Sequence, residues 1–167
     1  MKRIVIAVLL SAFVAVPAIA GDGKNGIGIS YGLGQSGVYG FQGEFDISAA
    51  MPHKAPVAIQ AFWKNYSQTF TFAAGTYQYS YNGFGVAGIY DFSSLSVLDK
   101  KFKPYAGVGL YTLNNTLSGP AAPLNVSSDS GGIYVTVGMR YAITPEVSAD
   151  LNYNNIGELT IGANFNF

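Results

Sequence analysis

The chain of 167 residues contains no cysteine, and charged residues make up only 11% of it. Without cysteine there are no disulfides, thiolate metal ligands, cysteine nucleophile or N-terminal lipid attached through a thiol. Soluble domains carry about 25% charged residues, so the low charge is unusual for a surface that faces water. The formal net charge is +0, and no basic patch suggests a nucleic-acid partner.

Long apolar runs are missing after Ala20, because Gly, Ser, Asn or a charge interrupts each one within a few residues. No membrane-spanning helix is therefore predicted there. The N-terminus differs: Lys2 and Arg3 precede an apolar stretch, and Ala18 and Ala20 match the A-x-A pattern of a signal-peptidase site. We predict a signal peptide at 1–20, cut after Ala20, and one domain at 21–167. An N-terminal anchor needs about 18 or more apolar residues, and this stretch is shorter.

Aromatic residues make up 14% of the chain, and apolar residues alternate with polar ones nearly throughout. A period of two indicates strands, and no sustained helical period competes with it. The clearest case is 133–141, where Ile133, Val135 and Val137 share one face while Thr136 and Arg140 lie on the other. The remaining segments are expected near 27–33, 39–47, 56–67, 77–92, 104–112, 147–153 and 158–167. Eight strands of about 9 to 12 residues match the length that crosses a bilayer.

Two barrels fit this alternation, because periodicity alone does not decide which face points inward. A soluble, lipocalin-like barrel would hold a small hydrophobic ligand and expose a polar face rich in Lys and Glu. Here the polar face is mostly Gly, Ser, Thr, Asn and Gln with isolated charges, which suits a narrow, protein-filled lumen. We therefore predict an all-β fold: an eight-stranded antiparallel up-and-down transmembrane β-barrel in the outer membrane of a Gram-negative bacterium, with both termini periplasmic.

Links between these strands should alternate between the two sides of the membrane. Outer loops are expected at 34–37, 67–76, 114–131 and 154–157, and periplasmic links at 49–56, 93–103 and 143–145. The fourth strand is ambiguous, because Tyr77, Tyr79 and Tyr81 occupy odd positions while Phe84 and Val86 occupy even ones. Either a bulge near Asn82 or a strand that extends beyond the bilayer explains this change. The three tyrosines near the preceding loop could add an aromatic contact surface, but we favour a place in the interfacial girdle.

Charges on the predicted lumen face are the main candidate site. Isolated buried ions are costly, so we expect Arg140 to pair with Glu44, Asp46 or Asp150 and to block a continuous water path; a gate for small ions is the alternative. The full set is Glu44, Asp46, Lys64, Arg140, Asp150 and Glu158.

The strand at 104–110, Pro-Tyr-Ala-Gly-Val-Gly-Leu, and the alternating terminal strand that ends at Phe167 resemble the small eight-stranded outer-membrane barrels, which include the barrel domain of outer membrane protein A. The resemblance implies that Phe165 and Phe167, with Tyr153 nearby, form the signal read by the barrel assembly machinery. Lipid-modifying barrel enzymes of similar size depend on an active-site histidine near the outer leaflet. His53 is the only histidine and is expected on the periplasmic side, without partners for a metal.

The prediction is therefore a non-enzymatic outer-membrane barrel of structural or surface-interaction type, a monomer without metal or cofactor. Its lumen is closed, and its outer loops offer a surface to a host or phage ligand. Its other expected partners are outer-membrane lipid, lipopolysaccharide and the barrel assembly machinery. A narrow channel for small solutes or ions and the soluble periplasmic barrel are the alternatives.

Overall fold

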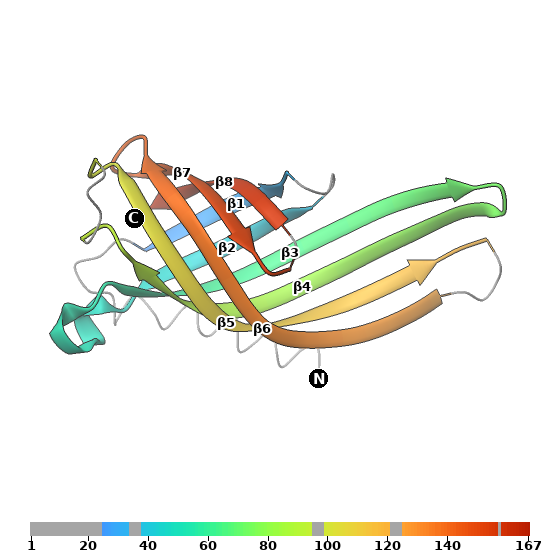
Figure 1. Ribbon diagram of the computed structural model, residues 1–167, viewed down its shortest axis with the longest axis horizontal. Helices are drawn as coiled ribbons and strands as arrows, with labels where there is room; N and C mark the ends of the chain where they lie inside the picture. Colours follow the sequence, from blue (N-terminus) through green and yellow to red (C-terminus); the bar gives the residue numbers. More distant parts are fainter. Residues whose placement is uncertain (1–24, 34–37, 95–98, 121–124, 157) are drawn as a thin grey trace.

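The structure is a computed structural model that describes residues 25–33, 38–94, 99–120, 125–156 and 158–167. In these ranges eight antiparallel strands follow one another around a closed barrel, and β8 pairs with β1 (Figure 1). The predicted all-β, up-and-down barrel is confirmed. The predicted signal peptide at 1–20 lies outside the described residues. The strands are β1 Gly26–Gly32, β2 Tyr39–Asp46, β3 Val57–Phe72, β4 Gly75–Asp91, β5 Phe102–Ser118, β6 Asn125–Ala142, β7 Val147–Asn154 and β8 Glu158–Asn166.

The two sides of the barrel wall differ in polarity, because successive side chains of a strand point to opposite sides. Val108, Leu110 and Ile133 point outward and are 61%, 68% and 62% exposed. The inward side carries buried polar residues: Gln60, Lys64, Thr136, Ser148, Asp150, Asn152, Asn154, Thr160 and Asn164. The apolar face therefore points outward, which is the reverse of what a soluble barrel with a hydrophobic cavity requires.

Strand length divides the barrel into two halves. β1, β2, β7 and β8 have 7, 8, 8 and 9 residues, whereas β3 to β6 have 16, 17, 17 and 18. Figure 1 shows β3 to β6 reaching far beyond the ends of the other strands, away from the C-terminus. We call this projecting part the outer sheet: 65–72 of β3, 75–82 of β4, 112–118 of β5 and 125–131 of β6.

The outer sheet corrects two predictions. Segments 67–76 and 114–131 were expected to be loops, but β3 continues to Phe72, β5 continues to Ser118, and β6 begins at Asn125. Their Thr, Tyr, Phe and Val residues favour extended backbone, and pairing between neighbouring strands satisfies the backbone hydrogen bonds. Among the described residues the sheet has two edges without a neighbouring strand, because β2 stops pairing with β3 at Asn65 and β7 stops pairing with β6 at Thr136.

The ambiguous fourth strand is continuous. Its register with β3 runs without interruption from Tyr90, opposite Val57, to Gly75, opposite Phe72. No bulge therefore occurs near Asn82, and the change in apolar positions belongs to a strand that extends past the barrel. The large apolar residues move from the outward side of β4, at Phe84 and Val86, to its inward side, at Tyr77, Tyr79 and Tyr81. This change occurs where the strand leaves the barrel wall, and the backbone pairing with β3 continues unchanged across it.

The opposite end of the barrel carries the shorter connections. Between β2 and β3 lie two single turns of 3-10 helix, η2 Ser48–Ala50 and η3 Pro52–Lys54. His53 is exposed and has a φ of 57°, in the left-handed region. The histidine thus lies at the end of the barrel away from the outer sheet, on a turn, as the predicted link at 49–56 requires.

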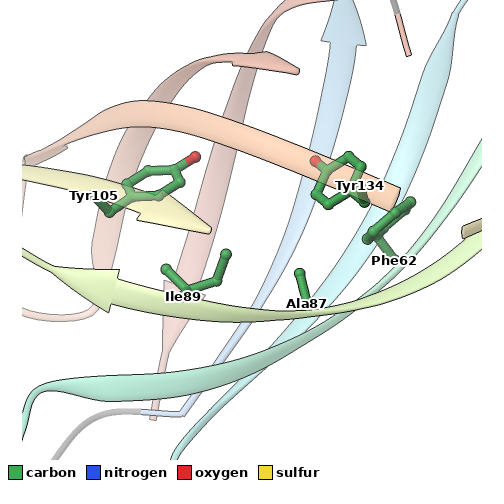
Figure 2. Packing of buried hydrophobic residues seen from close by; sticks show 5 residues of the cluster. All are labelled: Phe62, Ala87, Ile89, Tyr105 and Tyr134. Carbon is green, nitrogen blue, oxygen red and sulfur yellow. The ribbon is translucent and has the colours of Figure 1, made fainter. Parts of the chain in front are cut away.

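A small apolar cluster fills the middle of the lumen. Figure 2 shows Phe62, Ala87, Ile89, Tyr105 and Tyr134 pointing toward one another from the strands around it. The rings of Phe62 and Tyr134 meet at a centroid distance of 4.3 Å. The barrel interior is therefore packed with side chains at this level.

Candidate functional site

Arg140 stands at the centre of the lumen charges. It lies on β6 directly opposite Asp150 of β7. Its Nη1 donates to Glu44 Oε1 of β2 at 2.6 Å, Nη2 donates to Glu44 Oε2, and Nε donates to Asp150 Oδ2 at 3.4 Å. A guanidinium that binds one carboxylate through two nitrogens is held in a single orientation. Arg140 thereby links strands on two sides of the barrel.

Asp150 is only 2% exposed and is surrounded by donors. The Tyr105 hydroxyl donates to Asp150 Oδ1 at 2.9 Å, and Asn164 Nδ2 donates to Oδ2 at 3.1 Å. The Arg140 guanidinium also lies 4.4 Å from the centre of the Tyr105 ring. A buried carboxylate with this many partners avoids most of the cost of an isolated ion. We call Glu44, Arg140, Asp150, Tyr105 and Asn164 the lumen network.

The other predicted lumen charges lie outside this network. Asp46 Oδ1 accepts a hydrogen bond from Ser48 N at 2.7 Å and so shapes the turn that enters η2. It therefore serves the link after β2 and does not pair with Arg140. Glu158 pairs through its backbone with Asn154, and its side chain lies outside the described part of the chain.

Lys64 points into the lumen and is 6% exposed. Beside it, between Gln60, Tyr134 and Thr160, the structure leaves a cavity of about 10 Å³, room for about one water molecule. Toward the outer sheet the lumen is filled by Val38, Tyr66 and Tyr81, which are 1%, 3% and 6% exposed.

The aromatic residues that fill the lumen, Phe62 and Tyr134 in one layer and Tyr66 and Tyr81 in the next, were not predicted from the sequence. The alternation within β3 does indicate them. Phe62 and Tyr66 share the even positions of β3 with Gln60 and Lys64, so they belong to the inward face. Large rings on an otherwise polar face indicate a lumen filled by side chains. Closure of the lumen was predicted from the charges alone, whereas the structure adds two aromatic clusters, one with Phe62 and Tyr134 and one with Tyr66 and Tyr81.

The outer sheet reverses the polarity of the barrel wall. Its inward side, which continues the lumen face, carries mainly rings and aliphatic groups: Tyr66, Phe70, Phe72, Tyr77, Tyr79, Tyr81, Leu113, Leu117 and Val126. Its outward side carries Asn65, Ser67, Thr69, Thr71, Gln78, Ser80, Asn82, Asn114, Thr116 and Asp129. We call the inward side the aromatic face.

Much of the aromatic face is open to solvent. Phe70, Phe72, Leu117 and Val126 are 38%, 62%, 41% and 54% exposed. The rings contact one another: Phe72 lies 6.4 Å from Phe70 and 5.9 Å from Tyr77, centre to centre. Tyr77, Tyr79 and Tyr81 lie here, so their predicted place in the interfacial girdle is wrong.

The exposed apolar residues on the outward side of the barrel wall form a belt, and this belt ends where the outer sheet begins. Trp63 and Phe84 face each other as the last large apolar pair on the outward side of β3 and β4. The next outward pair is Asn65 and Asn82, joined by a hydrogen bond of 2.7 Å. A tryptophan beside the first polar row is typical of the girdle at a membrane surface.

The C-terminal aromatics lie on the outward side of the barrel. Tyr153, Phe165 and Phe167 are 56%, 50% and 72% exposed. Phe165 sits between Val147 of β7 and Ile27 of β1, at the seam that closes the barrel. This position leaves the rings accessible from outside the wall.

Among the described residues, no group of three or more His, Cys, Asp or Glu side chains is arranged to hold a metal ion. No helix in the described ranges has both the length and the apolar character needed to cross a membrane.

The family model described as the outer membrane protein beta-barrel domain matches residues 6–167. A comparison with curated proteins finds no match.

Solved outer-membrane barrels share the fold. The attachment invasion locus protein Ail of Yersinia pestis, in complex with the heparin analogue sucrose octasulfate, has a TM-score of 0.56 and 11% identity, over 86% of this chain and 97% of that one. Neisserial surface protein A has a TM-score of 0.57 and 19% identity, over 86% and 94%. A major outer membrane protein from Thermus thermophilus has a TM-score of 0.61 and 14% identity, over 86% and 99%.

Proposed function

Because the chain belongs to the outer membrane protein beta-barrel family, and is an integral outer-membrane barrel of structural or surface-interaction type, we propose that it holds the aromatic face above the membrane as a binding surface for an external partner. The barrel anchors this surface, and the lumen network with the aromatic layers keeps the interior closed. The protein acts by binding, and its outer sheet has no catalytic role.

The reversal of polarity in the outer sheet is the observation that carries this proposal. A strand that only lengthened the barrel into water would lose its apolar residues on both sides. Here the outward side becomes polar at Asn65 and Asn82, while the inward side gains Phe70 and Phe72, both exposed. Exposed apolar patches on soluble parts of proteins mark interaction sites.

The composition of the aromatic face favours an uncharged polypeptide partner. Tyr supplies rigid, amphipathic contact area, while Ser and Asn supply adaptable hydrogen bonds, as in antibody binding sites. Asn115 and Ser128 lie in the same row as Tyr66 and Tyr81. Tyr79 is already oriented by a hydrogen bond of 2.9 Å from its hydroxyl to Asn115 Oδ1, which lowers the entropy cost of binding.

The outer sheet carries too little positive charge to bind a polyanion. The described residues of the outer sheet include one charged side chain, Asp129, and no Lys or Arg. The Ail structure contains a heparin analogue, a highly sulfated molecule. Sulfate groups are recognised by cationic side chains, so this face is not built for such a ligand.

A selection with a random peptide library tests the proposal directly. The probe is a library displayed on phage, panned against the full mature protein in lipid nanodiscs. We expect enriched peptides of low charge whose affinity falls about tenfold or more, a loss of about 1.4 kcal/mol, when Phe70→Ser and Phe72→Ser are combined. Heparin on the same surface should show no saturable binding.

The matched control uses the other side of the same strand. Thr69→Ser combined with Thr71→Ser changes alternate positions of β3 and should leave peptide binding unchanged. If the enriched peptides bind the two double variants equally well, or if heparin binds and competes with them, the aromatic face is not the binding surface.

We also propose how the protein is exported and inserted into the outer membrane. The precursor is cut after Ala20, and Tyr153, Phe165 and Phe167 present the signal that the barrel assembly machinery reads. Their exposure on the outward side at the barrel seam supports this role. The mass of the purified mature protein tests the cut. The outer-membrane yield of Phe167→Ala, which should fall, tests the signal.

A further inference from the structure

The aromatic face is left uncovered by the rest of the chain that the structure describes. β3 to β6 continue past the ends of β1, β2, β7 and β8 (Figure 1), and no described strand stands opposite the aromatic face. Phe72 and Val126 are accordingly 62% and 54% exposed. The open side is as tall as the outer sheet itself, because the same difference in strand length creates both.

The outward side of the outer sheet, in contrast, is satisfied by hydrogen bonds within the sheet. Asn65 is hydrogen-bonded to Asn82 at 2.7 Å, and Gln78 Nε2 donates to Ser67 Oγ at 3.0 Å. These polar side chains already have partners in the same sheet. The aromatic face is therefore the side that gains most from being covered, since burial of exposed rings is favourable.

The aromatic face is complementary to a copy of itself. Asp129 is the only charged residue in the described part of the outer sheet, and it lies on the outward side, where it accepts a hydrogen bond from Asn114. Two such faces bring no like charges together, a juxtaposition that would oppose binding. Rings also pack well against rings, as Tyr66 and Tyr81 already do with their centres 5.2 Å apart.

The size of the face suits a weak and reversible pair. Four strands spaced about 4.8 Å apart and about 26 Å long offer roughly 500 Å² on each copy, so a pair would bury roughly 1,000 Å². This area is at the lower limit for a specific interface. A single pair binds weakly, but a membrane carries many copies, and simultaneous contacts between two surfaces raise the overall affinity.

The two copies of such a pair stand in different membranes. Packed sheets lie about 10 Å apart, and in a single membrane the β1, β2, β7 and β8 halves of both barrels would keep the two faces farther apart than this. With the membranes opposed, a two-fold axis parallel to both brings the faces together, and each sheet covers the open side of the other. The tip of each sheet, at Phe72, then meets the base of the other, at Tyr66.

We propose that the aromatic face binds the aromatic face of a second copy of this chain in an opposed membrane, so that the protein joins one cell surface to another that carries it. A two-fold interface is isologous, so each contact occurs twice. This inference rests on the proposed binding function of the aromatic face and names its partner.

Vesicles that carry the mature protein test the proposal. Two populations of phosphatidylcholine vesicles, each reconstituted with the protein and labelled with a different dye, are mixed and observed by fluorescence microscopy. We expect clusters with both dyes when both populations carry the protein, and none when one population is empty. Phe70→Ser combined with Phe72→Ser should lower the clustered fraction about tenfold or more, because every pair in a multivalent contact is weakened.

The matched control changes the outward side of the same strand. Thr69→Ser combined with Thr71→Ser should leave clustering unchanged. A heat-dependent shift in gel mobility shows for each variant that the barrel has folded.

An introduced thiol reports how the two copies are arranged, because the chain has no cysteine of its own. Gln68 lies on the inward side of β3, near the middle of the outer sheet and therefore close to the two-fold axis. When the two populations carry different peptide tags, a bismaleimide should cross-link Gln68→Cys between the tags. The neighbouring Thr69→Cys, which points outward, should remain uncross-linked.

Four results would overturn the proposal: attachment of protein-bearing vesicles to empty ones, which places the tip of the sheet in lipid; equal clustering of the two double variants; equal cross-linking at positions 68 and 69; or no clustering of the wild-type protein. If wild-type protein that does not cluster still binds the selected peptides through Phe70 and Phe72, the second copy is ruled out and the binding surface remains. If no peptides are enriched either, the proposed function fails as well.

Discussion

The side chains that meet at Arg140 show how a charge is accommodated inside a narrow barrel. Asp150 is almost fully buried and depends on donors from three directions: Arg140, Tyr105 and Asn164. Glu44 reaches the same guanidinium from β2. Because each ion is satisfied by others, the network ties distant strands together and leaves little room for water among them.

Arg140→Ala is expected to destabilise the folded barrel by about 3–5 kcal/mol, the usual cost of leaving a buried charge without its partner. Urea unfolding in lipid vesicles measures this, with exposed Glu146→Ala as the control. Adding Asp150→Asn to Arg140→Ala should recover part of the loss, because the buried charge is then removed. Unchanged stability in Arg140→Ala would contradict the structural role of the network.

Turning to whole strands, the outer sheet is an appendage that the barrel does not need for closure. In the part of the chain that the structure describes, β3 pairs with β4 alone beyond Asn65, the last position at which β2 pairs with it. The residues that close the ring, from 57 to 67 on β3 and from 80 to 90 on β4, remain paired without the tip. We therefore expect the stability of the barrel and the proposed binding by the aromatic face to be separable.

Replacing residues 68–79 by an Asn-Gly turn between Ser67 and Ser80, which face each other, should leave a folded barrel. A two-residue turn of this type is favoured in hairpins. The heat-dependent gel shift should persist, while binding of the selected peptides is lost. Loss of the gel shift would show that the tip contributes to barrel folding.

Strand length is also where prediction from the sequence was least accurate. The two faces of each strand were recognised from alternation, as Ile133, Val135 and Thr136 illustrate. The ends of β3 to β6 were misjudged, because segments such as 114–118 are polar and resemble loops when read in isolation. Their backbone is held by neighbouring strands, an interaction between distant parts of the sequence that local composition does not reveal.

At the level of the whole barrel, three successive layers block the lumen. The lumen network lies at the end away from the outer sheet, the cluster around Phe62 and Tyr134 follows, and Tyr66 with Tyr81 lies toward the outer sheet. Charges on the inward face were foreseen from the sequence, and so was the option of a narrow channel. The contact between the rings of Phe62 and Tyr134 was not predicted, because it joins two strands that are far apart in the sequence.

The intact protein is expected to show no conductance steps in a planar bilayer. Phe62→Ala combined with Tyr134→Ala should remove one layer only, and the other two should keep conductance absent. Adding Tyr66→Ala and Arg140→Ala should produce small steps if the quadruple variant still shows the gel shift. Steps from the unmodified protein would instead favour the narrow channel.

The length of the outer sheet limits where its partner can be. Eight residues of β3, from 65 to 72, continue past the apolar belt, and at about 3.3 Å per residue they extend at most about 26 Å. Sugar chains of lipopolysaccharide rise from the same surface. A cell coated with long chains would hide the aromatic face, whereas a cell with short ones would leave its tip uncovered. The same protein would then be accessible or concealed according to the sugar coat of the cell that makes it.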